Sequence, residues 1–315
     1  MTQTQLKYII AVDNYKSFTK ASQKLHITQP TLSMQIKKLE SELGLILFDR
    51  SKTPVATSDI GKLVVEQARK AISESSRIYD IIKEESEQIT GKFRLAAIPT
   101  IAPYLLPLFL EKFVEKNPGI ELTIDELQTE QIVDELKKDE IDAGIVATPL
   151  NKKELTEIPI YYEPFYAYVS QKHSLFGVEK ISSKELNINN IWLLKEGHCF
   201  RDQVINVCSS SMKEYQKRKY LLNFEGATLD TLIRMVENNF GMTIIPHLLA
   251  NELKTTRKRK FIRKFKNPIP KREISIIVQR SFLKKKIIDK LYKEIIDHLP
   301  AELTDKKSGY VVELY

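Results

Sequence analysis

The chain has 315 residues, of which 42% are hydrophobic and 29% charged, and its formal net charge is +8. This composition is that of a folded soluble protein, and the length favours a small domain followed by a larger one. No apolar run approaches the roughly 18 residues that span a membrane, and the first residues lack the basic and apolar regions of a secretion signal. We therefore expect a cytoplasmic protein without a membrane partner, whose positive charge permits a polyanionic one.

The N-terminal segment has the pattern of three short helices. Apolar residues at helical spacing predict the first over residues 4–13. Ser17 is placed to cap the second helix and Thr28 the third, which Gly44 ends. The apolar stripe of the third helix consists of Leu32, Ile36, Leu39 and Leu43. The tight link between the second and third helices predicts helix-turn-helix geometry.

The polar face of the third helix suits DNA reading, because glutamine pairs with adenine and hydroxyls with base or phosphate. Residues 45–48 and 55–57 read as two strands of a wing. A polar face alone is usually just solvated, but the wing favours DNA binding. The residues that we expect to contact DNA are Thr28, Gln29, Pro30, Thr31, Ser33, Met34, Lys37, Arg50 and Lys52. Eight Lys and Arg against five Asp and Glu before residue 60 leave a net charge of about +3, so non-specific binding should be modest.

A long helix is predicted to follow, capped by Ser58 and running to about residue 88. Its near-heptad stripe consists of Leu63, Val64, Ala68, Ile72, Ser75, Tyr79 and Ile82. A long helix with an uncompensated apolar stripe requires a partner helix, so we predict dimerisation. The predicted domains are a DNA-binding domain at 1–58, a linker and dimerisation helix at 59–90, a regulatory domain at 91–300 and a polar C-terminal tail at 301–315.

Strands and helices alternate beyond residue 90, which predicts an α/β fold with two lobes. In the first set we expect strands at 93–98, 120–127 and 143–147, with helices at 104–116 and 129–138, and hence a parallel sheet. In the second we expect strands at 161–170, 191–194, 242–245 and 273–278, with helices at 201–212, 229–239 and 284–299.

Both cysteines lie within residues 197–208. Cations and helix N-termini favour the reactive thiolate, and His198, Arg201 and a helix that begins near Arg201 would supply them around Cys199. Cys208 would then be the resolving partner. A helix between the cysteines would separate them by about 13 Å along its axis, whereas a disulfide needs Cα atoms about 4.4 to 6.8 Å apart. Oxidation would therefore have to break that helix.

Two other interpretations of this segment are weaker. Cysteines in a cytosolic chain are often simply small buried hydrophobic residues, although the polar neighbours of Cys199 make a poor core. His198 and Cys199 are adjacent, and adjacent residues seldom both bind a metal. We expect neither a metal site nor a cofactor.

Three N-terminal motifs carry a family resemblance: Ser-Phe-Thr-Lys-Ala-Ser at 17–22, Gln-Pro-Thr-Leu-Ser at 29–33 and Lys-Leu-Glu-Ser-Glu-Leu-Gly at 38–44. They resemble the winged-helix DNA-binding domain of LysR-type transcriptional regulators, and the resemblance covers residues 1 to about 65. Residues 99–107, 128–129 and 197–203, with Cys208, resemble the peroxide-sensing members of that family. This sequence departs from them at Ile101-Ala102, at Met34 and in its C-terminal tail.

The resemblance implies a two-lobed, periplasmic-binding-protein-like regulatory domain and a non-enzymatic, peroxide-responsive activator of oxidative-stress defence genes. Its partners would be double-stranded promoter DNA, RNA polymerase, hydrogen peroxide as the signal, and further copies of the chain in a dimer of dimers, a homotetramer. Peroxide oxidises Cys199 to a sulfenic acid, which Cys208 captures.

The residues expected to bind peroxide or to activate the thiolate are Thr100, Thr129, His198, Arg201, Asp202 and Arg272. Independently of the resemblance, Thr100 and Thr129 lie where open α/β sheets place ligand groups, although an isolated threonine at the position of Thr129 is more often a helix cap. A regulator that answers to a small metabolite in the inter-lobe cleft is the alternative. A thiol peroxidase or disulfide oxidoreductase is disfavoured, because the chain has no Cys-x-x-Cys motif.

Overall fold

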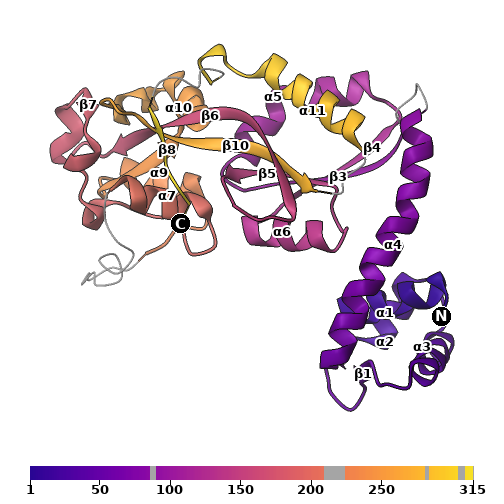
Figure 1. The fold of residues 1–315 in the computed structure, drawn as a ribbon. Helices are drawn as coiled ribbons and strands as arrows, with labels where there is room; N and C mark the ends of the chain where they lie inside the picture. Colours follow the sequence, from indigo (N-terminus) through magenta and orange to yellow (C-terminus); the bar gives the residue numbers. More distant parts are fainter. Residues whose placement is uncertain (86–89, 209–223, 281–283, 304–308, 315) are drawn as a thin grey trace. The chain divides into compact units, whose positions relative to one another are not determined.

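The computed structural model describes residues 1–85, 90–208, 224–280, 284–303 and 309–314 (Figure 1). The chain forms two compact units, Met1–Glu87 and Gln88–Tyr315, which are considered separately below. Within the described ranges, no helix has both the length and the apolar character that crossing a bilayer requires.

The N-terminal unit has a helix-turn-helix core and a short wing. Its elements are α1 (Gln3–Tyr15), α2 (Phe18–Lys24), α3 (Gln29–Leu43), β1 (Phe48–Asp49), β2 (Ala56–Thr57) and α4 (Asp59–Glu85). The Ser17 and Thr28 hydroxyls accept backbone N–H groups at the starts of α2 and α3, and Gly44 ends α3 with φ 70°. The three predicted helices and their caps are thus confirmed, while the wing strands are shorter than expected. Leu43 is not buried as predicted, because it lies in the last turn of α3, at the edge of the core.

The linker helix α4 begins where predicted, since the Ser58 hydroxyl accepts the Gly61 amide at 3.0 Å. Part of its stripe packs on the core of its own unit, with Ala68 buried and Val64 and Ile72 partly buried, whereas the side chain of Leu63 is 64% exposed. The expectation of a wholly uncompensated stripe is therefore wrong in this part of the helix. The side chains of Tyr79 and Ile82, and residues 86–88, lie outside the described part of the chain. Dimerisation through α4 stays a prediction.

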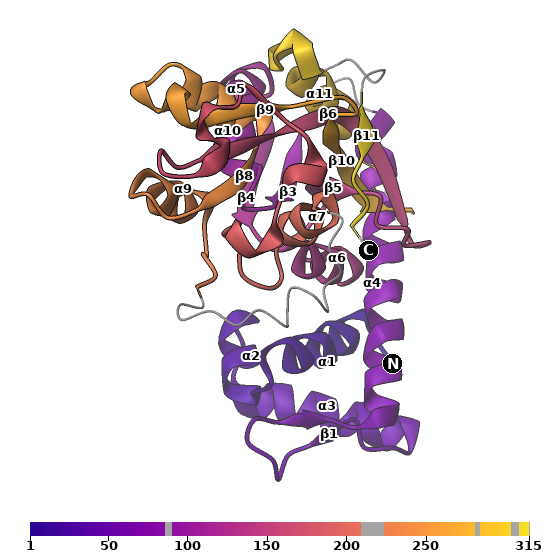
Figure 2. The same ribbon diagram turned by 90° about the vertical axis from the view of Figure 1, so that its left-hand side faces the viewer.

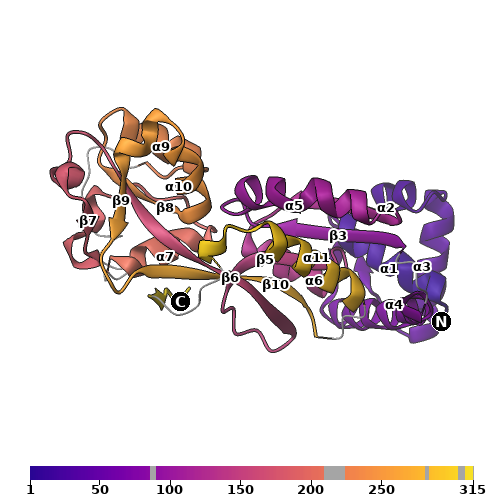
Figure 3. The same cartoon turned by 90° about the horizontal axis from the view of Figure 1, so that it is seen from above.

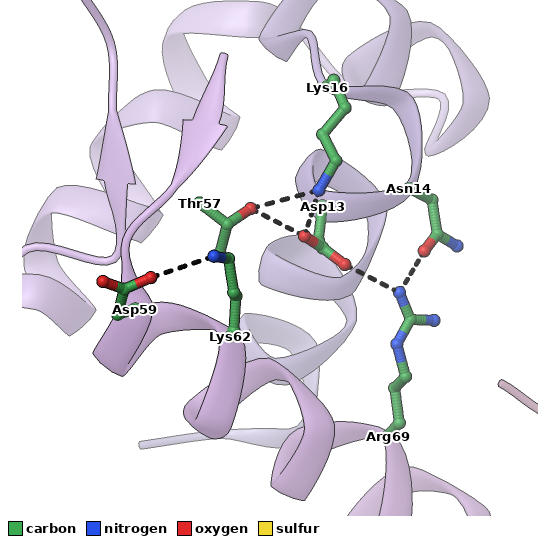
Figure 4. A network of polar contacts seen from close by, with 7 residues as sticks. All are labelled: Asp13, Asn14, Lys16, Thr57, Asp59, Lys62 and Arg69. Atoms are coloured by element: carbon green, nitrogen blue, oxygen red, sulfur yellow. Dashed lines mark hydrogen bonds and ion pairs between the residues drawn. The ribbon is translucent and has the colours of Figure 1, made fainter. Parts of the chain in front are cut away.

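One carboxylate ties together three elements of this unit (Figure 4). Asp13 in α1 accepts hydrogen bonds from Thr57 in β2 at 2.7 Å, from Arg69 in α4 at 3.1 Å and from Lys16 at 2.5 Å. Arg69 also donates to Asn14. Burial alone would raise the pKa of Asp13, but the hydrogen bonds from Lys16, Thr57 and Arg69 outweigh it and lower that pKa below its usual value. The wing and the linker helix are thus held to α1 by an ionised group.

We predict that Asp13→Asn destabilises the N-terminal unit by about 1–3 kcal/mol at pH 7, because a charged acceptor is lost. Since the folded-state pKa of Asp13 is lowered, its contribution is present above the unfolded value and is lost as the pH falls through the folded value. The stability difference between wild type and variant should therefore shrink as the pH falls below about 4. Urea unfolding measures this stability difference, with the folded fraction monitored by pulsed hydrogen exchange in peptides of α1. Asp59→Asn, in an exposed pair with Lys62, is the matched control, and an equal effect of the two changes would contradict the prediction.

The regulatory unit is built on a single mixed sheet with the strand order β4-β3-β5-β10-β6-β9-β7, to which β8 adds beside β6 and β11 beside β10. Its strands are β3 (Gly91–Ala97), β4 (Ile120–Glu126), β5 (Ala143–Thr148), β6 (Leu155–Val169), β7 (Lys180–Ile181), β8 (Met242–Pro246), β9 (Ile262–Phe265), β10 (Pro270–Gln279) and β11 (Tyr310–Val311). Its α-helices are α5 (Ala102–Lys116), α6 (Thr129–Lys137), α7 (Cys199–Val207), α9 (Leu229–Glu237), α10 (His247–Lys254) and α11 (Lys285–His298).

Two lobes share this sheet, as predicted. In lobe I, β3 runs parallel to β4 and β5, and α5 and α11 cover one face while α6 covers the other (Figure 1). Strand β6 belongs to both lobes, because its first part pairs with β10 and its last five residues pair with β8 in lobe II (Figure 3). Each lobe has its own apolar core. A single long strand therefore fixes the lobes next to each other.

Three sequence predictions fail in this unit. Residues 191–194 form isolated bridges at Ile191 and Leu194 rather than a strand. The helix expected at 201–212 begins at Cys199 and ends at Val207, and residues 209–212 lie outside the described part of the chain. The tail is not simply a polar addition, because Leu303, Val312 and Leu314 are buried among its described residues. Its polar residues gather at 304–308, whereas residues 310–314 are mostly apolar.

Candidate functional site

A small pocket lies between the two lobes, with about 170 Å³ of empty space. It is lined by Ile98, Pro99, Thr100, Gln128, Thr129, Gly197, His198 and Cys199. Lobe I contributes the end of β3 and the start of α6, and the start of α7 closes the other side. Thr100, Thr129 and His198, which were expected to act together on Cys199, thus lie with it in a single pocket.

The start of α7 places Cys199 in this pocket. His198 is the extended N-cap residue and Cys199 the first helical residue, so the thiol lies at the positive end of the helix dipole. Gly197 has φ +96°, and a Cβ added there would lie 2.4 Å from the Gln128 side-chain oxygen. Only glycine allows this turn to approach α6 so closely.

Thr129 is free to act on the thiol. Gln128 is the N-cap residue of α6 and forms a capping box with Gln131, so Thr129 does not cap the helix. Its hydroxyl is buried and has no partner that meets hydrogen-bond geometry in the described part of the chain. The hydroxyl nevertheless lies close enough to Cys199 to lower the pKa of that thiol. This arrangement favours a ligand-binding role for Thr129.

A buried ion pair forms the floor of the site. Arg272 in β10 and Glu163 in β6 are both fully buried, with Arg272 Nε 2.8 Å and Nη2 2.7 Å from the same carboxylate oxygen. The guanidinium also donates to the Thr100 hydroxyl oxygen at 2.8 Å and to the Thr100 carbonyl at 3.0 Å. It stacks over Phe200, 5.0 Å from the ring centre, and Glu163 accepts the Leu248 amide at 2.8 Å. The Thr100 hydroxyl oxygen is thus occupied as an acceptor, and its proton remains for donation.

The resting thiol is neutral rather than ionised. Burial raises the pKa of Cys199, and it outweighs the Thr129 hydroxyl and the Arg272 charge, which lower it. Asp202 raises that pKa further, so it disfavours the thiolate, contrary to the expectation that it activates it. Activation at this site must therefore come from groups that act as the reaction proceeds.

Two expected cations also differ from the prediction. Arg201 is buried and directs its Nη2 to Glu225 at 3.2 Å, so the nearby cation that acts on the thiol is Arg272. Arg201 lies two positions after Cys199 on the helix, and residues at that spacing do not face each other. The pKa of His198 is lowered, first by burial and then by Lys195, so its imidazole is neutral at neutral pH. It is suited to hydrogen bonding rather than to charge stabilisation.

The two cysteines occupy opposite ends of α7, as predicted. The two are not joined by a disulfide, and Cys208 is the C-cap residue, buried in the core of lobe II. They are nine positions apart, which on a helix is about 13 Å along the axis. A bond between them therefore requires α7 to unwind.

Glu163 and Phe200 contact Arg272 at the floor of the site and were not among the residues predicted from the sequence. A carboxylate within the apolar run of residues 161–170 was the available signal, since a buried charge requires a partner.

We predict that Thr129→Val slows the oxidation of Cys199 by hydrogen peroxide by about tenfold to a hundredfold, because a donor beside the reacting atoms is lost. The fold should not be weakened, since the buried hydroxyl satisfies no other group. Stopped-flow kinetics of thiol loss and a thermal unfolding curve measure the two quantities. Thr123→Val, on the exposed side of β4, is the matched control. If Cys199 is oxidised at the same rate in both variants, Thr129 takes no part in the reaction.

The predicted DNA-reading face is only partly free. Gln29, Thr31, Met34 and Lys37 are exposed on α3, and Thr28 serves as its cap. Arg50 instead donates to Ser33 at 2.8 Å and pairs with Glu40 at 3.0 Å. The expectation that Arg50 and Ser33 are free for DNA is therefore corrected, because the guanidinium braces the wing against α3. Lys52 remains largely exposed.

Comparison with known proteins identifies the class. The family described as "Bacterial regulatory helix-turn-helix protein, lysR family" matches residues 3–62, and "LysR substrate binding domain" matches residues 86–300. The chain therefore belongs to the LysR family.

Within this family, the chain is similar to regulators whose names refer to hydrogen peroxide or to OxyR. A "Hydrogen peroxide-inducible genes activator" of Haemophilus influenzae is 33% identical over 278 residues, which cover 88% of this chain and 90% of the relative. The "DNA-binding transcriptional dual regulator OxyR" of Escherichia coli K12 is 30% identical over 248 residues, covering 79% of this chain and 80% of the relative. Among solved structures, a full-length OxyR variant from Pseudomonas aeruginosa has a TM-score of 0.76 at 31% identity, covering 94% of this chain and 98% of that one.

Proposed function

We propose that this chain is a hydrogen-peroxide-sensing transcriptional regulator that binds promoter DNA and activates oxidative-stress defence genes. The observation that carries the proposal is the position of Cys199, at the first turn of α7 in a pocket with Thr100, Thr129 and His198, while Cys208 lies at the far end of the same helix. The names of the relatives support it.

The pocket residues suit the cleavage of a peroxide bond. As the Cys199 sulfur attacks one peroxide oxygen, the O–O bond breaks and the other oxygen leaves as hydroxide, which takes up the thiol proton and becomes water. Thr100 donates towards this oxygen, with its own oxygen held by Arg272. Because negative charge grows in the transition state, these fixed donors act most strongly there. The product at Cys199 is a sulfenic acid.

Cys208 completes the reaction. Its sulfur attacks the sulfenic sulfur of Cys199, and the S–O bond breaks. The oxygen leaves as water, which carries the sulfenic hydroxyl proton and the Cys208 thiol proton. The product is a disulfide that the intact α7 cannot contain. One oxidant molecule is thus converted into a change of backbone conformation, without catalytic turnover.

The lining of the pocket favours peroxide over a metabolite. None of its eight lining residues is a Lys, Arg, Asp or Glu that would hold an ionic metabolite. The polar groups nearest the thiol are two threonine hydroxyls and one imidazole, which suit a small uncharged molecule with two oxygen atoms.

The proposed assembly is a dimer of dimers that recruits RNA polymerase at promoters. The exposed polar face of α3 and the cation Lys52 in the wing support contact with DNA. The exposed apolar side chains Leu63 and Ile78 on α4 support pairing of the chains.

We predict that Cys199→Ser abolishes the response to peroxide, whereas Cys208→Ser leaves a sulfenic acid on Cys199. The reason is that Cys199 lines the pocket and therefore reacts with peroxide before Cys208 does. Dimedone labelling with peptide mass spectrometry after one equivalent of peroxide checks the assignment. Dimedone found on Cys208 instead would reverse the two roles.

A further prediction concerns DNA reading. Gln29→Ala should weaken binding to the cognate site by about 1 to 3 kcal/mol and relax base preference there. Lys52→Ala should weaken binding to all sequences alike and flatten its salt dependence. Fluorescence anisotropy with cognate and random duplexes at several salt concentrations separates the two effects. Equal losses on both duplexes for Gln29→Ala would exclude it from base recognition.

A further inference from the structure

The C-terminal segment 309–314 is built into the regulatory unit (Figure 2). Strand β11 pairs in parallel with the start of β10, where Tyr310 lies opposite Pro270 and Val311 opposite Lys271. The Tyr310 amide donates to the Ile269 carbonyl at 3.0 Å, and the Val312 amide to the Lys271 carbonyl at 2.8 Å. We call residues 309–314 the C-terminal latch.

The latch binds the helix that separates the cysteines. Gln203 in α7 donates to the Val312 carbonyl at 3.3 Å, and Asn206 donates to the Glu313 carbonyl at 2.9 Å. Gln203 is fully buried, so its amide could not exchange this bond for water without exposing the helix. These contacts exist only while residues 203 and 206 hold their helical positions.

Apolar side chains of the latch reach both cores. Val312 is buried in the lobe II core together with Val204, Val207 and Cys208, and Leu314 is buried in the lobe I core. A segment of six residues therefore contributes to the cores of both lobes, one of which also contains the resolving cysteine. None of the residues that line the pocket belongs to the latch.

A glycine permits the close approach of the latch to β10. Gly309 has φ +103°, and a Cβ added there would lie 2.3 Å from the Ile269 carbonyl oxygen. A backbone carbonyl cannot move aside as a side chain can, so any other residue at 309 must displace the start of the latch.

Resting on the peroxide-sensing function above, we propose that the C-terminal latch holds α7 in its helical form and thereby sets the rate at which Cys208 resolves the Cys199 sulfenic acid. For the Cys208 sulfur to displace water from the Cys199 sulfenic acid, the Cα atoms must approach from about 13 Å to within about 7 Å. That movement displaces Gln203 and Asn206 from the latch carbonyls. The first step, attack of Cys199 on peroxide, takes place at the other end of α7 and does not require it.

The test compares the two rates in the full chain. Gly309→Ala disturbs the start of the latch, Val312→Ala removes two methyl groups from its buried contact with α7, and Glu313→Ala changes only an exposed side chain and is the control. After mixing with hydrogen peroxide, samples are quenched with dimedone or iodoacetamide and analysed by mass spectrometry. We expect unchanged sulfenic-acid formation in all variants. Disulfide formation should be about tenfold faster in Gly309→Ala and Val312→Ala, the scale of losing one buried aliphatic contact, and unchanged in Glu313→Ala.

A second measurement addresses the wild type. Hydrogen exchange should show that peptides of residues 309–314 lose protection on oxidation, together with α7. Two outcomes would contradict the proposed role of the latch without affecting the proposed function. One is a disulfide that forms at the wild-type rate in both latch variants, and the other is a latch that is equally protected in both redox states. Absence of a Cys199–Cys208 disulfide in the wild type overturns the proposed function, and the latch with it.

Discussion

The site depends on a guanidinium that is completely buried. Arginine keeps its charge under all ordinary conditions, so Arg272 requires permanent partners inside the protein. It finds them in Glu163 and in both oxygens of Thr100, so that three separate segments of the chain, including its own, meet here. Because removal of one partner leaves a buried charge unpaired, at a cost of about 3–5 kcal/mol, the three segments are locked in one arrangement. The orientation of the Thr100 hydroxyl and the packing of Phe200 at the start of α7 both follow from this lock.

The same arrangement explains how a thiol can be both protected and reactive. Burial keeps Cys199 protonated at rest, which limits its reaction with the many electrophiles that select thiolates. The Thr129 hydroxyl, the Arg272 charge and the helix N-terminus all favour negative charge, and they matter most when that charge develops during attack on the oxidant. Selectivity then arises from the fit of the reacting atoms to fixed donors, rather than from a permanently ionised sulfur.

The sequence predicted the features that depend on neighbouring residues. Hydroxyls at Ser17 and Thr28 and the glycine at 44 mark helix ends through local backbone bonds, and apolar spacing locates the strands of lobe I. Contacts between distant segments were harder. Arg201 was expected to act on the thiol because it adjoins Cys199 in the chain, and Arg272 was expected only through the family resemblance. The charge that acts on the thiol is Arg272, which lies in β10 and is paired with a carboxylate 109 residues away. The latch was missed because the polar run at 304–308 was taken as typical of the whole tail, whereas residues 310–314 are mostly apolar.

The shared strand β6 has a mechanical consequence. Together with the return into β10 and the latch, it provides three described crossings between the lobes, each held by backbone hydrogen bonds or buried side chains. A bond between the two cysteines would act on lobes that are tied together at these three places. A covalent bond can impose a shape that weak binding cannot, and it persists after the oxidant has disappeared. Such a protein keeps a record of exposure, and the time for which the record lasts is set by cellular reductants rather than by the concentration of the signal.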